Sequence, residues 1–351
     1  MTLRAGIIGF GVAGRYFHAP LLRAAGFSIA AVVTSKPAPA REYLRDVDVL
    51  ATADELLARN DIDLVAIASP SPLHVTHAAA ALRAGKHVVV DKPLAPTAAE
   101  VSELEQLAAQ HKRKLSVFQN RRWDSDFLTV KKLIEQGRLG KINSFHARWD
   151  RFRPQVSDRW RERDEPGNGI LYDLGTHLID QTLQLFGQPE WLYANVFSQR
   201  ENSVTVDGFE MLLGQGALRI TLGVSLLCAD GGYRYRVNGS QASFLKPGLD
   251  PQEAQLRAGL EPDEHLFGTE PVEQWGTLVH GETGQREVIT PETGRWLAFY
   301  EGMREAIEHD RPVPVPAAQA YDTIRIIEAA LTSSAMGCRI DLQPAAPLVS
   351  R

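Results

Sequence analysis

The 351-residue chain has little cysteine, no cluster of metal-ligand residues and no long apolar run. Its two cysteines, Cys228 and Cys338, form no C-x-x-C pair and have no histidine cluster beside them, which argues against a disulfide scaffold or a structural zinc site. We therefore expect no metal, and a reducing, cytoplasmic setting. No run approaches the roughly 20 apolar residues that a membrane span needs, so we expect no membrane partner.

The chain also lacks a basic block. Its 38 Lys and Arg residues are spread along the sequence against 43 Asp and Glu, which gives a net charge of −5. Binding a row of phosphates needs clustered positive charge, so we expect no nucleic-acid partner. With 44% hydrophobic and 23% charged residues, the composition is that of an ordinary globular protein. At about 150 residues per domain, the length predicts roughly two domains.

The first 120 residues alternate short β-branched runs with longer helical stretches. The expected strands cover residues 5–8, 27–33, 64–68, 87–90 and 114–118. The expected helices cover residues 12–25, 72–84 and 97–110, and Thr97 with Glu100 matches a capping box. This alternation predicts an α/β fold with an N-terminal Rossmann domain, a doubly wound parallel sheet, over residues 1–120.

After residue 120 several strands follow one another without intervening helices, which indicates an open, mostly antiparallel sheet. The expected strands cover residues 142–152, 191–198, 204–213, 217–227 and 233–237. The expected helices cover residues 125–136, 171–186, 296–308 and 317–334. Residues 246–275, rich in proline, glycine and acids, are expected to form a long surface excursion. We predict a second α/β domain over residues 121–351.

Residues 9–14 read Gly-Phe-Gly-Val-Ala-Gly and lie between an expected strand and an expected helix. The glycines permit a tight turn and close approach of the backbone to a pyrophosphate, and the helix N-terminus favours the negative charge. A glycine-rich structural turn is the alternative. The strand before and the helix after the motif favour dinucleotide binding.

The expected second strand ends near Val33, where many NAD enzymes place an acidic residue on the ribose hydroxyls. This chain has Thr34, Ser35 and Lys36 there. Two hydroxyls and an ammonium group can bind a 2′-phosphate that an acid would repel, so we predict NADP rather than NAD. The alternative is that Lys36 is a solvated loop residue and selectivity is weak.

Two further segments lie at carboxyl ends of expected strands, where open α/β sheets bind ligands. One contains Ser69, Pro70 and His74, and the other reads Asp91-Lys92-Pro93. Either Pro70 or Pro93 could follow a cis peptide bond. Taken alone, Asp91-Lys92-Pro93 is typical of a surface turn.

The segment 167–177 adds a glycine-flanked loop that leads into an expected helix. Asp173 and His177 are four residues apart, so both should project from one face of that helix near its start. The same spacing also occurs by chance on solvated helices.

Together these motifs resemble the glucose-fructose oxidoreductase/inositol dehydrogenase (Gfo/Idh/MocA) family over essentially the whole chain. Shorter matches at residues 17–20, 119–127, 150–154 and 248–252 resemble a bacterial branch that includes NADP-dependent scyllo-inositol 2-dehydrogenases. Asp91 stands where the family often has Glu, and Asn168 where it often has a third glycine. We expect the first difference to be tolerated, and Asn168 is a candidate substrate contact.

The resemblance implies hydride transfer between NADP(H) and a secondary alcohol or carbonyl of a cyclitol or sugar. The implied acid/base is His177. Lys92 would favour the developing alkoxide, and Asp173 would bind a neighbouring hydroxyl or orient the imidazole. The alternatives are an NADP-dependent aldose, ketose or dicarbonyl sugar reductase, and a non-catalytic nicotinamide-sensing regulator. The resemblance also implies a homodimer or homotetramer.

Two sets of binding residues complete these expectations. The expected cofactor contacts are Gly9, Gly11, Val12, Ala13, Gly14, Thr34, Ser35, Lys36, Ser69, Pro70, His74, Asp91, Lys92 and Arg122. The expected substrate contacts are Trp123, Arg153, Trp160 and Asn168, because arginine and tryptophan can bind hydroxyls or stack on sugar faces. A structural salt bridge or an apolar plug is the alternative for each Arg and Trp in these sets.

Overall fold

The computed structural model describes residues 2–342, which form two compact units. The first unit contains residues 2–124, Pro251–Gly268 and Gly294–Tyr321. The second contains Ser125–Asp250, Thr269–Thr293 and residues 322–342. A single boundary at residue 120 therefore does not account for the two later segments that belong to the first unit.

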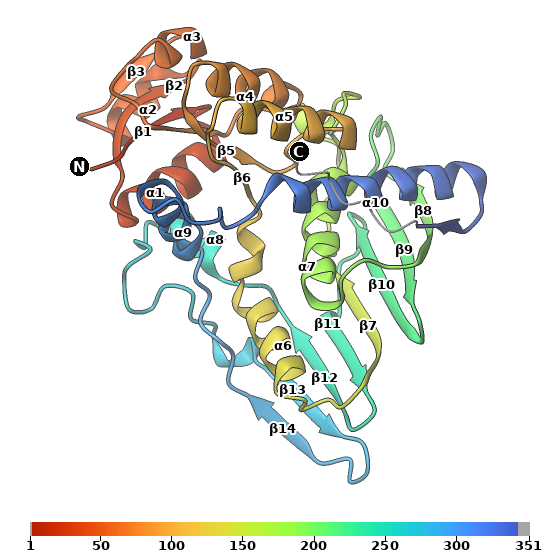
Figure 1. Cartoon of the computed structure of the whole chain (residues 1–351). Helices are drawn as coiled ribbons and strands as arrows, with labels where there is room; N and C mark the ends of the chain where they lie inside the picture. The colour runs from red at the N-terminus through yellow and green to blue at the C-terminus, as the bar shows by residue number, and fades with distance from the viewer. Residues whose placement is uncertain (1, 343–351) are drawn as a thin grey trace. The chain divides into compact units, whose positions relative to one another are not determined.

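The first unit is built on a six-stranded parallel sheet with strand order β3-β2-β1-β4-β5-β6 (Figure 1). Its strands are β1 (Arg4–Ile8), β2 (Ser28–Val33), β3 (Asp48–Leu50), β4 (Leu64–Ile67), β5 (His87–Asp91) and β6 (Leu115–Phe118). Strands β1, β2, β4, β5 and β6 are buried over most of their length because helices cover both faces. The order is that of a doubly wound sheet, so the expected fold class is confirmed for this part of the chain.

Helices α3 (Ala53–Leu57), α4 (His74–Arg83) and α5 (Ala98–Gln110) lie on one face of this sheet, and α1 (Ala19–Ala24) lies on the other (Figure 1). The remaining helices of the unit are α2 (Pro37–Tyr43), α8 (Gln252–Ala258) and α9 (Leu297–Glu308). The expected capping box at Thr97 is confirmed, since its hydroxyl accepts from the Glu100 amide and its own amide donates to the Glu100 carboxylate.

The expected continuous helix over residues 12–25 is instead a π-helical turn, Gly14–His18, followed by α1. The Ala19 amide donates to the Gly14 carbonyl, five residues earlier. Pro20 explains the widening, because it has no amide hydrogen and its ring would clash with the carbonyl four residues before it.

The second unit contains a mixed nine-stranded sheet with order β14-β13-β12-β11-β7-β10-β9-β8-β15, in which only the β7 and β10 pair is parallel. The strands are β7 (Ile142–Arg148), β8 (Trp191–Phe197), β9 (Gly208–Gln215), β10 (Leu218–Ser225), β11 (Tyr233–Gly239), β12 (Ala242–Pro247), β13 (Gly276–His280), β14 (Arg286–Ile289) and β15 (Ile340–Asp341). The expected mostly antiparallel sheet is confirmed.

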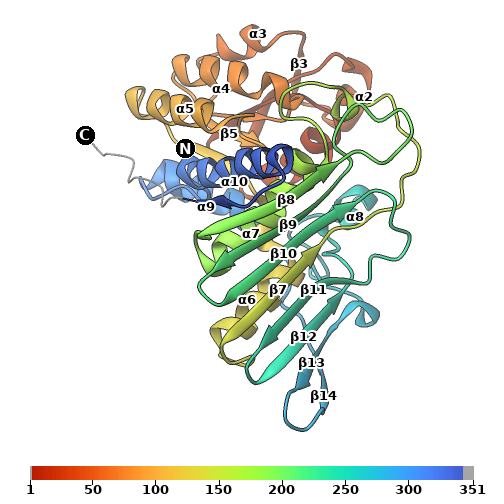
Figure 2. The same ribbon diagram turned by 90° about the vertical axis from the view of Figure 1, so that its right-hand side faces the viewer.

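Helices α6 (Ser125–Glu135) and α7 (Thr176–Phe186) cover one face of the nine-stranded sheet, and Figure 2 turns the other face toward the viewer. Most of α10 (Ala317–Met336) also belongs to this unit, and its Ser333 hydroxyl accepts from the Ala194 amide of β8. Along β12 buried and partly exposed positions alternate, as expected for a sheet with one covered face.

The expected surface excursion over residues 246–275 is wrong at Lys246 and Glu270, which are buried. Lys246 lies in β12 with no exposed side-chain area, and its ammonium is 2.9 Å from the Glu270 carboxylate. Ser125 donates to the same carboxylate at 2.6 Å, while burial raises the pKa of Glu270 and the Lys246 charge opposes that shift. The intervening segment carries α8 and belongs to the first unit.

A buried histidine at the end of the π-helical turn gives the first unit a pH-sensitive core. His18 is fully buried, and its Nδ1 lies 2.6 Å from the Tyr300 hydroxyl. Its Nε2 has no hydrogen-bond partner among residues 2–342. Burial lowers the pKa of His18 to about 4, although the Asp91 charge partly opposes this and His74 adds to it. The folded protein therefore holds this imidazole neutral.

We expect the free energy of unfolding to fall as the pH drops from 6.5 toward 4. The unfolded chain protonates His18 near pH 6.5 and the folded chain only near 4, so the stabilisation is complete above 6.5, decreases between 6.5 and 4 and is lost below 4. The shift corresponds to about 3 kcal/mol. Urea unfolding at several pH values should show a shallower pH dependence for His18→Gln than for the wild type. Parallel curves would contradict this assignment.

Candidate active site

The glycine-rich turn joins β1 to the π-helical turn and is held by the backbone of its own unit. Gly9 has a φ of 95°, and its amide donates to the Val33 carbonyl at 3.0 Å. A Cβ on Gly9 would lie 2.5 Å from the Ala68 carbonyl oxygen, and one on Gly14 would lie 2.1 Å from the Gly9 carbonyl oxygen. Packing alone therefore requires glycine at both positions.

Gly11 differs from its two neighbours. It is exposed and has no positive φ, and a Cβ built on it would have no described atom within 4 Å. Nothing in residues 2–342 therefore requires glycine here. The open space in front of the turn fits a pyrophosphate that approaches the backbone closely, which is the use of a middle glycine in a dinucleotide-binding turn.

We expect alanine at Gly9 to affect stability and alanine at Gly11 to affect dinucleotide binding. Gly9→Ala should lower the melting temperature by several degrees, because the new Cβ overlaps backbone that cannot move away. Gly11→Ala should leave the melting temperature unchanged and weaken dinucleotide binding about tenfold or more. Thermal unfolding and titration with NADPH fluorescence measure the two effects. Unchanged NADPH affinity in a folded Gly11→Ala protein would contradict the proposed pyrophosphate position.

At the end of β2, Thr34 is partly buried, whereas Ser35 and Lys36 are exposed. The Lys36 amide donates to the Thr34 hydroxyl at 3.1 Å, which closes the turn into α2. The three residues thus lie at the carboxyl end of β2, next to β1. A Rossmann sheet binds the adenosine ribose of its dinucleotide at this position.

The loops after β4 and β5 are joined by His74. This residue is 1% exposed, with Nδ1 2.7 Å from the Pro93 carbonyl oxygen and Nε2 2.9 Å from the Ser69 carbonyl oxygen. Burial lowers the pKa of His74, while its contacts with the Pro93 and Ser69 carbonyls and the Asp91 charge oppose that shift. His74 holds two loops together, and its expected contact with a cofactor stays a prediction.

The second of these loops carries Lys92. Its amide donates to the Asp91 carboxylate at 2.9 Å. The Lys92–Pro93 peptide bond is cis, so of the two prolines expected to follow a cis bond, Pro93 does. Asp91 ends β5 and Lys92 follows it, while Ser69 and Pro70 follow the carboxyl end of β4, the neighbouring strand in the sheet. The first unit therefore gathers these residues and the glycine turn at one edge.

Arg122 and Trp123 follow β6 in a 3₁₀ turn, Asn120–Trp123. The Arg122 guanidinium donates to the Gln319 side chain at 2.6 Å, and the Trp123 ring packs 5.9 Å from the Phe299 ring. The Trp123 carbonyl accepts from Gln252 and from the Arg295 amide. Both residues have structural partners, and their ligand contacts stay predictions.

In the second unit, Asp173 and His177 lie where a π-helical turn, Leu171–Gly175, leads into α7. The sequence predicts a regular α-helix from residue 171, and the structure instead has a π-helical turn over its first five residues. Such turns are frequent at functional sites. His177 is 4% exposed, and its ring centroid lies 5.8 Å from that of Trp149. The Asp173 carboxylate is 3.5 Å from Arg161 Nε.

The indole of Trp149 is itself held by two arginines. Arg234 and Arg151 stack on it at 4.9 and 5.6 Å. Arg234 also donates to the Gln181 side chain at 2.9 Å, which accepts from the Tyr235 hydroxyl at 2.7 Å as well. The wall beside His177 is therefore fixed by cation–π and hydrogen-bond contacts. Sequence reasoning missed Trp149, Arg234 and Arg161, which lie 16 to 57 residues from His177 along the chain.

Of the expected substrate contacts, Trp160 and Asn168 come together. The side-chain amide of Asn168 donates to the Trp160 carbonyl at 2.6 Å and to the Arg163 carbonyl at 3.2 Å. The Arg161 guanidinium stacks on the Trp160 ring. Arg153 is exposed, and its amide donates to the Leu226 carbonyl at 2.7 Å. Asn168 closes this loop, and its substrate contact stays a prediction.

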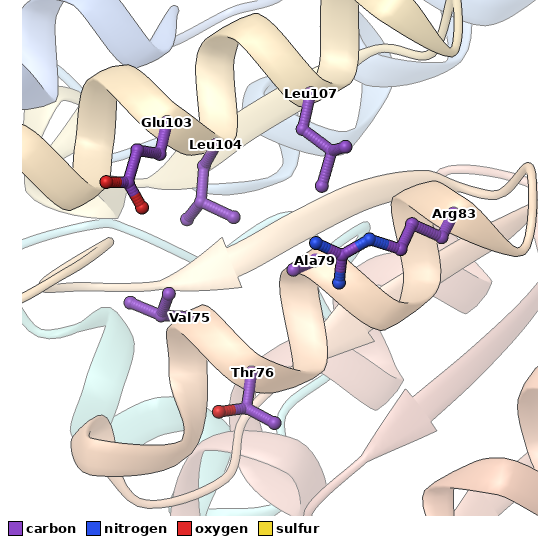
Figure 3. Close-up of a pocket in the computed structure, with 7 residues that line it drawn as sticks. All are labelled: Val75, Thr76, Ala79, Arg83, Glu103, Leu104 and Leu107. Atoms are coloured by element: carbon purple, nitrogen blue, oxygen red, sulfur yellow. The ribbon is translucent and has the colours of Figure 1, made fainter.

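A surface pocket of about 320 Å³ lies between α4 and α5 (Figure 3). Val75, Leu104 and Leu107 form its apolar part, with Arg83 and Glu103 beside them. None of the expected site residues lines it, so it carries no catalytic argument. Among residues 2–342 no group of acidic, histidine or cysteine side chains could hold a metal, and no helix there is long and apolar enough to cross a membrane.

Comparison with known proteins assigns most of the chain to one family. Residues 3–119 match the NAD-binding Rossmann fold of an oxidoreductase family, and residues 131–342 match its C-terminal alpha/beta domain. The chain belongs to the Gfo/Idh/MocA oxidoreductase family. The expected family is therefore confirmed, and with it an oxidoreductase that has an NAD-binding Rossmann domain.

Three relatives of this Gfo/Idh/MocA protein cover nearly its whole length. The scyllo-inositol 2-dehydrogenase (NADP(+)) IolW of Bacillus subtilis is 41% identical over 95% of this chain and 94% of its own. The uncharacterized oxidoreductase YdgJ of Escherichia coli is also 41% identical, over 95% and 96%. The solved structure of the Bacillus subtilis oxidoreductase yvaA is 40% identical, with a TM-score of 0.94 over 97% of this chain and 99% of its own.

Proposed function

We propose that this protein is an NADP-dependent dehydrogenase that oxidises a secondary alcohol of a cyclitol, with scyllo-inositol as its substrate. The observation that carries the proposal is the 41% identity, over 95% of the chain, to a protein named scyllo-inositol 2-dehydrogenase (NADP(+)). The Lys, Asp and His residues that such chemistry requires are all present.

The preference for NADP is supported by the chemistry at the end of β2. Thr34, Ser35 and Lys36 offer two hydroxyls and an ammonium group, and no carboxylate stands among them to repel a phosphate. Charge-assisted hydrogen bonds of this kind are about twice as strong as neutral ones. We expect NADP⁺ to bind more tightly than NAD⁺.

The proposed mechanism divides the work among three side chains. NADP, when bound, supplies the hydride acceptor. His177 takes the proton from the substrate hydroxyl, since imidazole can exchange a proton near neutral pH. Lys92 directs its positive charge at the same oxygen and favours the alkoxide as it forms. Asp173 accepts a hydrogen bond from a second substrate hydroxyl, and Arg161 orients its carboxylate.

The test is nicotinamide reduction by the purified protein with scyllo-inositol, myo-inositol and a set of aldoses, each with NADP⁺ and NAD⁺. We expect turnover with scyllo-inositol and NADP⁺. Turnover only with aldoses, or only in reduction of a dicarbonyl sugar, would replace the proposal by a sugar reductase. Tight NADPH binding without turnover of any substrate would favour a nicotinamide-sensing regulator.

A further inference from the structure

Arg15, directly after the glycine motif, carries a positive charge that no carboxylate within residues 2–342 balances. Its guanidinium carbon lies 5.0 Å from the Tyr16 ring centroid and 5.0 Å from the Tyr43 ring centroid. Its Nε is buried without a hydrogen-bond partner, and no ion pair to Arg15 occurs within residues 2–342. Two aromatic rings therefore hold a guanidinium whose donors have no anion.

The two tyrosines place this group beside the dinucleotide turn. Tyr43 ends α2, which begins directly after Lys36, and its ring lies 6.0 Å from that of Phe10 in the glycine motif. The neighbouring Gly9 amide is bonded to the last residue of β2. Arg15 thus lies by the carboxyl ends of β1 and β2, where sheets of this type bind the adenosine ribose.

A neighbouring arginine shows what a purely structural role looks like. Arg23 stacks on the same Tyr43 ring at 5.5 Å, but it donates to the Tyr43 hydroxyl at 3.4 Å and lies 3.9 Å from the Glu261 carboxylate. Its charge is therefore compensated within the first unit. Arg15 has the same ring contact without either compensation, so packing on Tyr43 does not account for its charge.

We propose that Arg15, together with Lys36, binds the 2′-phosphate of NADP and determines the choice between NADP and NAD. The inference rests on the proposed NADP preference and adds a residue to it. A guanidinium presents several donors in one plane, which suits a phosphate dianion. The Tyr16 and Tyr43 rings restrict its rotation before the ligand arrives, so less side-chain freedom is lost on binding.

The test uses 2′,5′-ADP and 5′-AMP, which differ only in the 2′-phosphate and need no turnover. Isothermal titration of both ligands should show the wild type binding 2′,5′-ADP at least tenfold more tightly. Arg15→Met should bind 2′,5′-ADP about tenfold more weakly and 5′-AMP within twofold of the wild type. The matched control is Arg23→Met, which removes the other arginine that stacks on Tyr43 and leaves Arg15 in place. It should change neither affinity.

Two results with Arg15→Met would overturn the proposal. An Arg15→Met protein that keeps the wild-type preference for 2′,5′-ADP overturns the proposal, as does an equal loss for both ligands, which would place Arg15 on the adenine. Arg15→Lys, which keeps the charge, should retain part of the preference and controls for misfolding in Arg15→Met; no preference in a folded Arg15→Lys protein would contradict a charge contact. A wild type that binds both ligands equally would instead refute the NADP preference itself.

Discussion

Replacing His177 with alanine is expected to lower kcat about a thousandfold and to leave NADPH affinity within twofold. A positioned general base contributes roughly 10²- to 10⁴-fold, and water in the vacated space cannot hold the proton in the same place. Steady-state assays with scyllo-inositol and NADP⁺ measure the loss, and NADPH fluorescence titration measures the affinity.

Two further variants separate this effect from a loss of structure. His177 is 4% exposed and packs against Trp149, so alanine leaves a cavity. His177→Asn fills more of that space without a basic nitrogen and should be as inactive as alanine. His309, an exposed residue at the end of α9, is a matched control, and His309→Ala should keep full activity. Full activity of His177→Ala would exclude His177 as the acid/base.

Replacing Lys92 with methionine is expected to lower kcat by roughly 10²- to 10³-fold, the usual cost of losing one group that stabilises a developing oxyanion. Methionine keeps much of the chain length without the charge. The lysine lies in a loop that His74 and the Asp91 carboxylate hold in place, so the backbone should not move. Initial rates over a range of scyllo-inositol concentrations measure kcat and KM.

Lys92→Arg distinguishes the two tasks that the lysine could perform. Arginine keeps the positive charge but does not release a proton, because the pKa of its guanidinium lies far above neutral pH. If charge stabilisation dominates, Lys92→Arg should recover about tenfold of the loss in Lys92→Met. If both variants are equally slow, the proton of Lys92 takes part. Wild-type kcat in Lys92→Met would remove Lys92 from the mechanism.

The parts of the fold that depend on local pattern could be predicted from sequence. The runs before Gly9, Ser69 and Lys92 are short, mostly apolar and contain valine or isoleucine, and they form the buried parallel strands β1, β4 and β5. The motifs after them occupy the strand ends as expected. Strand β3 was not predicted, because three residues with partial exposure carry too little periodicity.

Features set by tertiary contacts could not be predicted in this way. Lys246 reads as a solvated residue, and only the fold brings Glu270 and its compensating charge to it. Trp149 and Arg234 shape the surroundings of His177 from strands far along the chain. The π-helical turn before α7 likewise has no distinct periodicity over its five residues. Local sequence therefore located the chemical groups, and packing determined what surrounds them.

The most direct test of hydride transfer is the fate of deuterium from scyllo-inositol labelled at its ring carbons. The protein is incubated with this substrate and NADP⁺, and the reduced nicotinamide is analysed by mass spectrometry. Direct transfer predicts one deuterium in each NADPH molecule formed, with none gained from deuterated water when unlabelled substrate is used. NADPH formed without substrate deuterium, or no NADPH formed at all, would contradict the assigned reaction.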